Sequence, residues 1–246
     1  NDVFVGEHEG GYLPFWFDVT DAICGEENVL KLVVTDTLSH DYPYGKQKKK
    51  PGGMWYTQVS GIWQSVWLES VPSYYIERIK LTPDLNGVDV ELTVAGDSIY
   101  DREAACGIDS DGIMQSKPDT FGVSITLHNG QTIEKTFAGL HGRVNLSDLV
   151  LTDGSFYIPK LWTPDEPYLY SMTVYAGEDK ADTYFALRTI NIEETPAGKR
   201  VCLNEEPIFL HGVLDQRYYP EGIYLPAKEK EYEADIMRMK ELRINM

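Results

Sequence analysis

The sequence has few basic residues, few cysteines and no long apolar run, and each scarcity bears on what the protein can do. Lysine and arginine together number 22 against 39 aspartates and glutamates, which gives a formal net charge of −17. Such an acidic surface repels phosphate backbones and anionic lipid headgroups, so nucleic-acid and membrane partners are disfavoured. No apolar run approaches the roughly 20 residues that a membrane-spanning helix needs.

The three cysteines, Cys24, Cys106 and Cys202, are odd in number and far apart. They form neither a disulfide framework nor a Cys-x-x-Cys zinc pair, which favours a reducing, cytoplasmic compartment. The histidines never pair at metal-ligand spacing, and the segment Asp109–Gly112 departs from a calcium loop at its later positions, so we predict a turn there and no metal. Nucleotide-binding and self-contained hydrolase motifs are absent from the sequence, so no cofactor is identifiable.

What the sequence does have is period-two alternation of apolar and polar residues over its first 190 positions. The alternation predicts strands over 30–34, 88–94, 123–127, 170–175 and 184–192. After 123–127 comes Asn129-Gly130, a dipeptide favoured in tight hairpins whose two turn residues both need positive φ. Short strands separated by turn signals indicate β-sandwiches.

After residue 200 the period changes. The apolar run 207–213 suits a buried parallel strand, and a loop with two tyrosines follows it. A helix is predicted to begin near Pro226, since proline is favoured in a first helical turn. Its apolar stripe is formed by Tyr232, Ile236 and Met239. A strand, a loop and an amphipathic helix make the opening βα unit of an α/β domain.

Residues 54–72, MWYTQVSGIWQSVWLESVP, resemble the last strand of the sugar-binding sandwich in family 2 glycoside hydrolases, the group of β-galactosidases, β-glucuronidases and β-mannosidases. Three other segments resemble the same family in the same order. They are VGEHEGGYLPFWFDVTDAICGEENVLKLVV (5–34), LWTPDEPYLYSMTV (161–174) and LNEEPIFLHGVLDQRYYPEG (203–222).

The resemblance implies a mainly β fold with three parts. Residues 1–72 would form the C-terminal part of a jelly-roll sugar-binding domain, 73–192 an immunoglobulin-like sandwich, and 193–246 a linker and the first βα unit of a truncated (β/α)8 barrel. Breaks at Val71-Pro72-Ser73 and at 193–199 agree with these boundaries, because proline cannot continue a central strand.

Two structural expectations follow from the same comparison. Trp63 and Trp67 are expected mainly to fill the core of the first sandwich and its seam with neighbouring domains. Glu205 and Arg243 stand where the family pattern has glycine, and the second substitution puts the turn after the helix in doubt, because glycine would adopt a left-handed cap there at little steric cost.

The resemblance also implies a function. Family 2 enzymes are retaining hydrolases, in which two Glu carboxylates about 5–5.5 Å apart serve as acid/base and nucleophile. The resemblance places both on later barrel strands, outside these 246 residues. The chain is therefore expected to be an inactive fragment of an exo-β-glycosidase, β-galactosidase-like or β-glucuronidase-like, whose partner is a carbohydrate. Incomplete sheets leave unpaired edges, which predict edge pairing or a homo-oligomer.

Two other interpretations remain open. The chain could belong to a non-catalytic carbohydrate-binding protein made of the same sandwiches, or to a structural module of stacked sandwiches. The barrel-like tail argues against the first of these, and the unpaired cysteines and the tail argue against the second.

Candidate sugar contacts fall on two loops. In family members an Asp just before the first tryptophan of 54–72 reaches over the active site, and here Gly53 takes that place. Its candidate substitutes in the preceding loop are Asp41, Tyr44, Lys46 and Gln47.

The second loop follows the predicted barrel strand 208–213. Strand C-termini converge on the active-site face of a βα barrel, so this loop is expected to reach that face. Asp215 and Gln216 are expected to hydrogen-bond sugar hydroxyls, and Tyr218 or Tyr219 to stack on a pyranose ring. In the alternative interpretation, Asp215 and Arg217 pair with each other and brace the barrel rim.

Overall fold

The computed structural model describes residues 1–96 and 117–246, so Cys106 and the turn predicted at 109–112 lie outside the described residues. The chain divides into two compact units, Asn1–Leu68 and Glu69–Met246. In its described residues the second unit is mainly β, with antiparallel sheets and one C-terminal helix.

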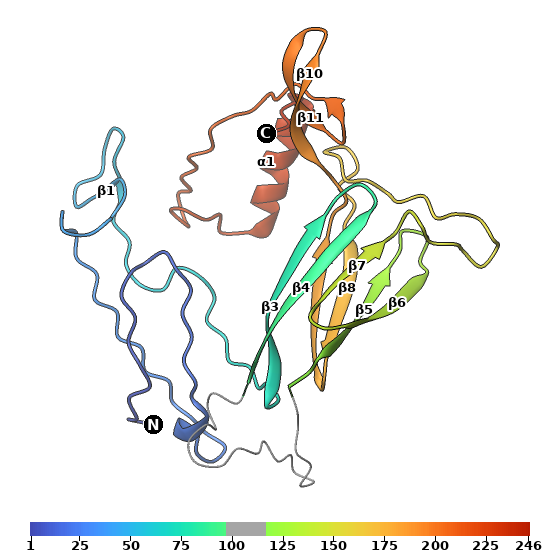
Figure 1. The fold of residues 1–246 in the computed structure, drawn as a ribbon. Coiled ribbons are helices and arrows are strands. Elements are labelled where there is room, and N and C mark those ends of the chain that lie inside the picture. Colours follow the sequence, from blue (N-terminus) through green and yellow to red (C-terminus); the bar gives the residue numbers. More distant parts are fainter. Residues whose placement is uncertain (97–116) are drawn as a thin grey trace. The chain divides into compact units, whose positions relative to one another are not determined.

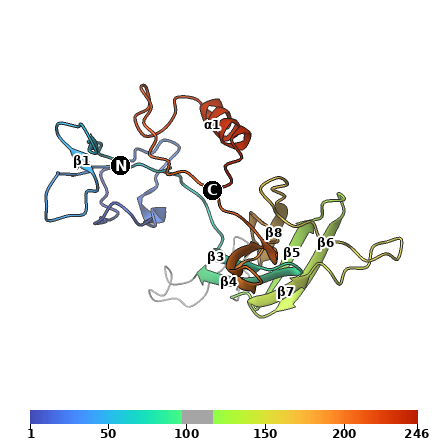
Figure 2. The same ribbon diagram turned by 90° about the horizontal axis from the view of Figure 1, so that it is seen from above.

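A two-layer β-sandwich makes up most of the second unit (Figures 1 and 2). One sheet has the order β3-β4-β7 and contains β3 (Tyr74–Pro83), β4 (Gly87–Gly96) and β7 (His141–Asn145). The other has the order β6-β5-β8-β9 and contains β5 (Thr120–Thr126), β6 (Thr132–Ala138), β8 (Tyr170–Ala176) and β9 (Asp179–Phe185). Neighbouring strands in both sheets are antiparallel.

The core lies between the two sheets because their inner faces carry the apolar residues of alternating strands. In β4 the buried side chains are Val88, Val90, Leu92 and Val94. In β5 and β8 they are Phe121, Val123, Ile125, Tyr170, Met172 and Val174. All of them belong to one hydrophobic cluster, which confirms the alternation predicted over 88–94, 123–127 and 170–175.

The hairpin predicted at Asn129-Gly130 joins β5 to β6. Gly130 has a φ of 84°, whereas Asn129 does not have positive φ. Gly130 N–H donates to the Leu127 carbonyl at 3.0 Å, and Leu127 N–H donates to the Gln131 carbonyl at 2.8 Å. The connection is therefore a turn followed by a single left-handed glycine, and not the two-residue turn with two positive φ angles.

An ion-pair network holds β4, β7 and the β3–β4 turn together. Arg143 of β7 donates to Asp89 of β4 at 2.7 Å and to Asp84 of the turn at 2.6 Å. Asp84 also accepts the backbone N–H groups of Asn86 and Gly87. Burial favours the neutral acid, but the hydrogen bonds from Asn86, Arg143 and Gly87 outweigh it and hold the pKa of Asp84 below its usual value.

A third antiparallel sheet follows the sandwich, with the order β10-β11-β12. Its strands are β10 (Ile190–Thr195), β11 (Gly198–Leu203) and β12 (Glu206–Pro207). The single strand predicted over 184–192 is wrong, because these residues are the end of β9, a connection and the start of β10. Alternation continues to the buried Leu187, but its carbonyl accepts the N–H of Trp162 in a loop.

Residues 193–199, which the sequence predicts as a linker, form the turn end of the β10–β11 hairpin, with Glu194 paired to Lys199. The next turn, from β11 to β12, consists of Asn204 and Glu205, with φ angles of 53° and 69°. A two-residue hairpin loop with positive φ at both positions has type I′ geometry and favours Asn followed by Gly. Glu205 therefore holds a glycine position.

Helix α1 spans Glu229–Glu241 and so begins later than the predicted start at Pro226. It ends in a Schellman motif, in which Arg243 N–H donates to the Lys240 carbonyl and Ile244 N–H to the Met239 carbonyl, both at 2.9 Å. Arg243 has a φ of 57°. The left-handed turn thus forms even though arginine stands in place of the expected glycine.

The buried strand predicted over 207–213 is wrong. Beyond β12 this segment is extended without a ladder, and Phe209 is 83% exposed. Asn245 N–H donates to the His211 carbonyl at 2.9 Å, and Val213 N–H donates to the Met246 carbonyl at 3.1 Å. A buried parallel strand needs covered faces and neighbouring strands. The described residues supply only one short neighbour, Asn245-Met246.

The first unit, drawn in blue in Figure 1, has little regular structure in its described residues. It contains η1 (Thr20–Ala22) and a short parallel pair, β1 (Gln47–Lys48) with β2 (Tyr56–Thr57). Asp18 accepts the backbone N–H and the hydroxyl of Thr20 at 2.9 and 2.6 Å, and these bonds lower the pKa of Asp18.

The strand predicted over 30–34 does not form, and neither does the tryptophan-rich strand. Trp63 and Trp67 are 65% and 73% exposed, so the expectation that they fill a sandwich core is wrong for this unit. Alternation decides which side chains share a face, but burial needs several paired strands or a covering layer. The described residues of this unit supply only the β1–β2 pair.

Candidate functional site

The loop between β12 and α1 is organised around Arg217. Its Nε donates to Asp215 Oδ2, and its Nη1 donates to Tyr219 Oη at 3.1 Å and to Asp235 Oδ2 at 3.3 Å. Asp235 lies on α1, so one guanidinium joins the loop to the following helix. We call Asp215, Arg217, Tyr219, Tyr232 and Asp235 the Arg217 cluster.

Aromatic rings cover the same guanidinium. The Arg217 Cζ atom lies 5.7 Å from the centre of the Tyr232 ring, and Tyr219 meets Tyr232 edge-on with 6.4 Å between centroids. Tyr218, next in the loop, meets Tyr224 edge-on at 6.0 Å. Arginine over an aromatic face is a stabilising arrangement, so the loop is held by both charge and ring contacts.

The base of the loop is closed by a backbone bridge. Tyr219 N–H donates to the Ile223 carbonyl at 2.7 Å, and Ile223 N–H donates back at 3.0 Å. Ile223 has a φ of 60°, a rare conformation for a β-branched residue. At Gly222 a Cβ atom would collide with the Leu225 carbonyl oxygen, so a residue without a side chain is required there.

The electrostatics of the cluster keep Arg217 charged and leave acceptor capacity on Asp215. The hydrogen bond to Tyr219 and the bond to Asp215 raise the pKa of Arg217, against the desolvation that lowers it. A carboxylate has about four acceptor positions. Asp215 therefore pairs with Arg217, as the bracing interpretation predicts, and can still accept a hydrogen bond from a hydroxyl group. Gln216 lies between these two residues in the same loop.

In the first unit, the four candidates lie around β1. Gln47 donates from Nε2 to the Tyr44 carbonyl at 3.0 Å and accepts Val59 N–H at 2.9 Å, so both ends of its amide hold the loop. The Lys46 carbonyl accepts Tyr56 N–H at 2.8 Å. These contacts make Gln47 a half-buried structural residue of this loop.

Of the other candidates of this loop, Asp41 and Lys46 are more open, whereas Tyr44 is half-buried like Gln47. Asp41 accepts the Ser39 hydroxyl at 2.7 Å and is exposed, as is the side chain of Lys46. The Tyr44 hydroxyl lies 3.1 Å from Nδ1 of His40. Gly53, which takes the place of the family's Asp, has a φ of 60°. This set and the Arg217 cluster belong to different units of the chain.

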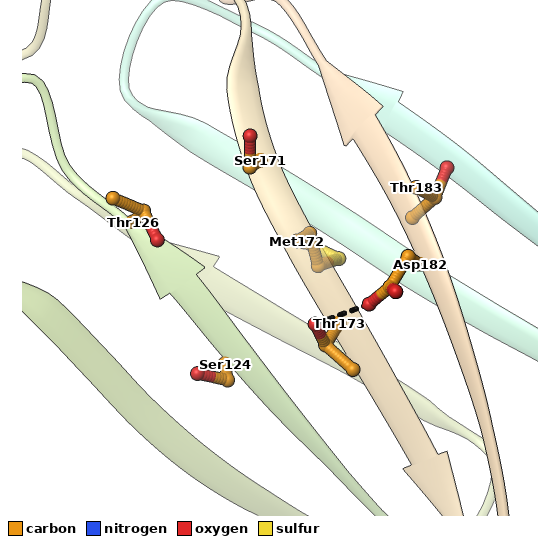
Figure 3. Close-up of a pocket in the computed structure, with 7 residues that line it drawn as sticks. All are labelled: Ser124, Thr126, Ser171, Met172, Thr173, Asp182 and Thr183. Carbon is orange, nitrogen blue, oxygen red and sulfur yellow. Dashed lines mark hydrogen bonds between the residues drawn. The ribbon is translucent and has the colours of Figure 1, made fainter.

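A third feature lies on the sandwich. A shallow hollow of about 280 Å³ is lined by residues of β5, β8 and β9. Figure 3 shows its lining, which includes Ser124, Thr126, Ser171, Thr173 and Asp182, and the hydrogen bond from the Thr173 hydroxyl to Asp182 Oδ1 at 2.6 Å.

Within residues 1–96 and 117–246, no group of three or more His, Cys, Asp or Glu side chains is placed to hold a metal ion. In the same residues, no helix combines the length and apolarity that crossing a membrane requires. Cys24 is exposed, Cys202 is buried, and both are free thiols.

Comparison with known proteins decides the family. Residues 74–188, which span the sandwich from β3 to just beyond β9, match the profile of the glycosyl hydrolases of family 2. This chain carries a family 2 region. The resemblance drawn from the four sequence segments is thereby confirmed, for a region that covers only part of full-length relatives.

The curated relatives are β-galactosidases and β-glucuronidases by name. A β-galactosidase of Thermoanaerobacter pseudethanolicus is 26% identical over 258 residues, covering 100% of this chain and 31% of the relative. A β-galactosidase of Thermoanaerobacterium thermosulfurigenes is 28% identical and likewise covers 100% of this chain and 32% of the relative. A β-glucuronidase of Canis lupus familiaris is 24% identical, covering 87% and 33%. The chain thus spans about a third of the length of these relatives.

Solved structures of β-glucuronidases are also similar. The β-glucuronidase of Faecalibacterium prausnitzii matches with a TM-score of 0.46 and 18% identity, covering 69% of this chain and 23% of that one. A β-glucuronidase of Ruminococcus gnavus matches with a TM-score of 0.47 and 16% identity, covering 69% and 23%.

Sequence reasoning found the loop residues but missed their partners on the helix. It named Asp215 and Arg217, but neither Asp235 nor the ring contact of Tyr232 with Arg217. The available signal was spacing: Tyr232 and Asp235 are three apart and so share a helix face. An acidic residue beside an aromatic on that face is a suitable partner for a nearby arginine.

Proposed function

We propose that this chain is part of a glycosidase that hydrolyses terminal β-linked sugars, with β-galactosidase-like specificity. The observation that carries the proposal is the match of 100% of this chain to β-galactosidases of two thermophilic genera by name. The three parts expected from the resemblance, a jelly-roll sugar-binding part, an immunoglobulin-like sandwich and the start of a barrel, belong to this proposal. The three- and four-stranded sheets of the described sandwich support its immunoglobulin-like assignment.

In the proposed enzyme this chain contributes to substrate binding and the chemistry lies elsewhere. Retaining hydrolysis needs a carboxylic acid that protonates the leaving oxygen and a carboxylate that attacks the anomeric carbon. The family resemblance assigns both to later barrel strands. The role proposed for this chain is to present Asp215 and Gln216 to sugar hydroxyls, with Arg217 holding the loop against α1 through Asp235.

A β-glucuronidase specificity is the second candidate. The dog β-glucuronidase match over 87% of this chain favours it. A glucuronide carries a carboxylate, which needs a cation that is not already paired. Arg217 is engaged by Asp215 and Asp235, so the Arg217 cluster itself favours a neutral sugar.

Two measurements test the proposal. The purified 246-residue chain should release no p-nitrophenol from p-nitrophenyl β-galactoside or β-glucuronide above the blank. The product of the complete gene should hydrolyse the β-galactoside faster than the β-glucuronide. Turnover by the 246-residue chain that disappears when one of its acidic residues is changed would overturn the assignment of the chemistry.

The binding role is tested in the complete gene product with Asp215→Ala. If Asp215 bonds a hydroxyl in the transition state, kcat/KM should fall by about tenfold or more. Asp235→Asn is the matched control, because it alters the same guanidinium without touching the proposed sugar contact. Equal losses in both variants that track their thermal stability would make Asp215 a structural residue.

A further inference from the structure

The outer face of the four-stranded sheet is rich in hydroxyl groups. Side chains of β5, β6 and β8 that alternate with the buried ones point away from the core. On these strands they include six hydroxyl residues, Ser124, Thr126, Thr132, Thr136, Ser171 and Thr173. Threonine is favoured in strands, so the number of hydroxyl residues is ordinary, and what matters is how the strand register arranges them.

The strand register brings these groups into a continuous polar row. Glu134, Ser124, Thr173 and Asp182 are paired across four neighbouring strands. The hollow lies over this row, and the Thr173 hydroxyl is oriented by its bond to Asp182 (Figure 3). Ser124, Thr173 and Asp182 therefore present hydroxyl groups and one carboxylate side by side in a depression of about 280 Å³. Glu134 continues the row on β6, beyond the lining residues.

Two exposed tyrosines lie on the same outer face, beyond the residues that line the hollow. Tyr175 of β8 is 43% exposed and Tyr184 of β9 is 66% exposed. Tyr184 pairs with Ser171, four residues along β8 from Tyr175. At the usual rise per residue and strand spacing, the two tyrosine Cα atoms are about 14 Å apart. Both side chains belong to the same outer face as the polar row.

We propose that this face, from Tyr175 to Tyr184, binds a neutral oligosaccharide without hydrolysing it. Sugars offer hydroxyl groups to donors and carboxylates, and apolar ring faces to aromatic side chains such as tyrosine, which presents an apolar face and a polar tip. Two rings about 14 Å apart, with polar groups between them, span more than one pyranose unit. The ligand is therefore a chain of sugars.

The charges on this face favour a neutral ligand over an anionic one. Asp182 and Glu134 lie in the row, and the exposed Lys180, paired with Tyr175, lies on the same face, so carboxylates outnumber the cation there. Together with the net charge of −17 on the whole chain, this disfavours uronic-acid and sulfated glycans. A protein partner fits less well, since the core of a protein interface is depleted of charged residues, and here Asp182 lies between the two tyrosines. The site is separate in the chain from the Arg217 cluster and does not require the proposed hydrolytic function.

The experiment is a titration of the isotope-labelled 246-residue chain followed by amide resonances. The probes are cellotetraose, β-1,4-galactotetraose and xylotetraose, with a galacturonate tetramer as the anionic comparison. At least one neutral probe should shift amides of β5, β8 and β9 and saturate. Tyr184→Ala should weaken that binding by about five- to tenfold, whereas Tyr184→Phe should retain most of it.

The control variant is Glu178→Gln, which removes one charge in the exposed turn of the same β8–β9 hairpin and should leave binding unchanged. Thermal unfolding of each variant shows whether the sandwich is intact. The proposal is overturned if no neutral probe binds, if binding survives Tyr184→Ala, or if the galacturonate binds as well as the neutral probes. Failure of the hydrolysis assays would leave this result untouched, because the shifted amides of β5, β8 and β9 locate the binding on the sandwich and the titration requires no hydrolysis.

Discussion

Replacing Glu205 by glycine should stabilise the second unit. Glu205 is an exposed residue with a φ of 69°, in the second position of the Asn204-Glu205 turn between β11 and β12. An L-residue in the left-handed region costs about 1–2 kcal/mol, because Cβ crowds the following carbonyl oxygen. Glycine avoids this cost but loses about 0.5–1 kcal/mol more backbone entropy on folding. The net gain expected for Glu205→Gly is about 0.5–1 kcal/mol.

The assay is thermal unfolding, together with amide hydrogen exchange of β10 and β11. A gain of this size in a chain of this length raises the unfolding midpoint by about 1–4 °C. Exchange should slow in the β10–β11–β12 sheet, where the turn is formed, before it slows in the sandwich.

Charge has to be separated from backbone geometry, because loss of a carboxylate by itself relieves repulsion in a chain with net charge −17. Glu205→Ala removes the same charge and keeps the strained Cβ. Glu206→Gly makes the same substitution one residue later, in β12, where glycine weakens a strand. If the alanine variant gains as much as the glycine variant, or if Glu206→Gly also stabilises, the reasoning from φ is refuted.

Three further predictions follow from the described contacts. Arg243→Gly should stabilise α1 by about 0.5–1 kcal/mol, since Arg243 occupies the left-handed position of its Schellman motif, and unchanged helix unfolding by circular dichroism would contradict this. The folded-state pKa of Asp84 is lowered, so the ionised carboxylate stabilises the fold fully above its unfolded pKa, and this contribution is lost as pH falls through the folded pKa. In unfolding measurements from pH 5 to pH 2, the wild-type chain should therefore lose more free energy of unfolding than the Asp84→Asn variant. The exposed tryptophans and apolar side chains of the first unit should make the 246-residue chain associate, so a hydrodynamic radius independent of concentration in light scattering would count against edge or surface pairing.

How much of the fold was predictable depended on where each strand finds its partners. Residues 88–94, 123–127 and 170–175 lie in two sheets whose strands are all in the described sandwich, and there alternation and burial agree. Residues 30–34 and 208–213 have equally clear apolar patterns but are exposed. An apolar pattern specifies which side chains of a strand share a face. Whether that face is buried depends on a second layer of structure, which the local sequence does not contain.

The candidate site divides in the same way. The loop and its polar residues were visible in the sequence, because Asp215, Gln216 and Arg217 follow an apolar run and precede a helix. The choice between sugar contact and bracing depended on Asp235, eighteen positions beyond Arg217, and on the rotation of α1 that presents it. The pairing of both Asp215 and Asp235 with the Arg217 guanidinium depends on the tertiary structure. The Asp215–Arg217 contact fits the bracing interpretation, yet the free acceptor positions of Asp215 leave the proposed sugar contact chemically open.

Glu205 and Arg243 show what sets the geometry around this loop. Each stands where the family resemblance places glycine, and each nonetheless adopts the left-handed conformation, with φ of 69° and 57°. The turns are fixed by backbone hydrogen bonds, from the Leu203–Glu206 pairing at one and from the Schellman bonds at the other. These bonds do not depend on the side chain, so a residue that fits poorly raises the energy of the turn without changing its path. The strain therefore lowers the free energy of unfolding. It does not change the direction in which the chain enters the loop or leaves α1, so Arg217 keeps its place against Asp235.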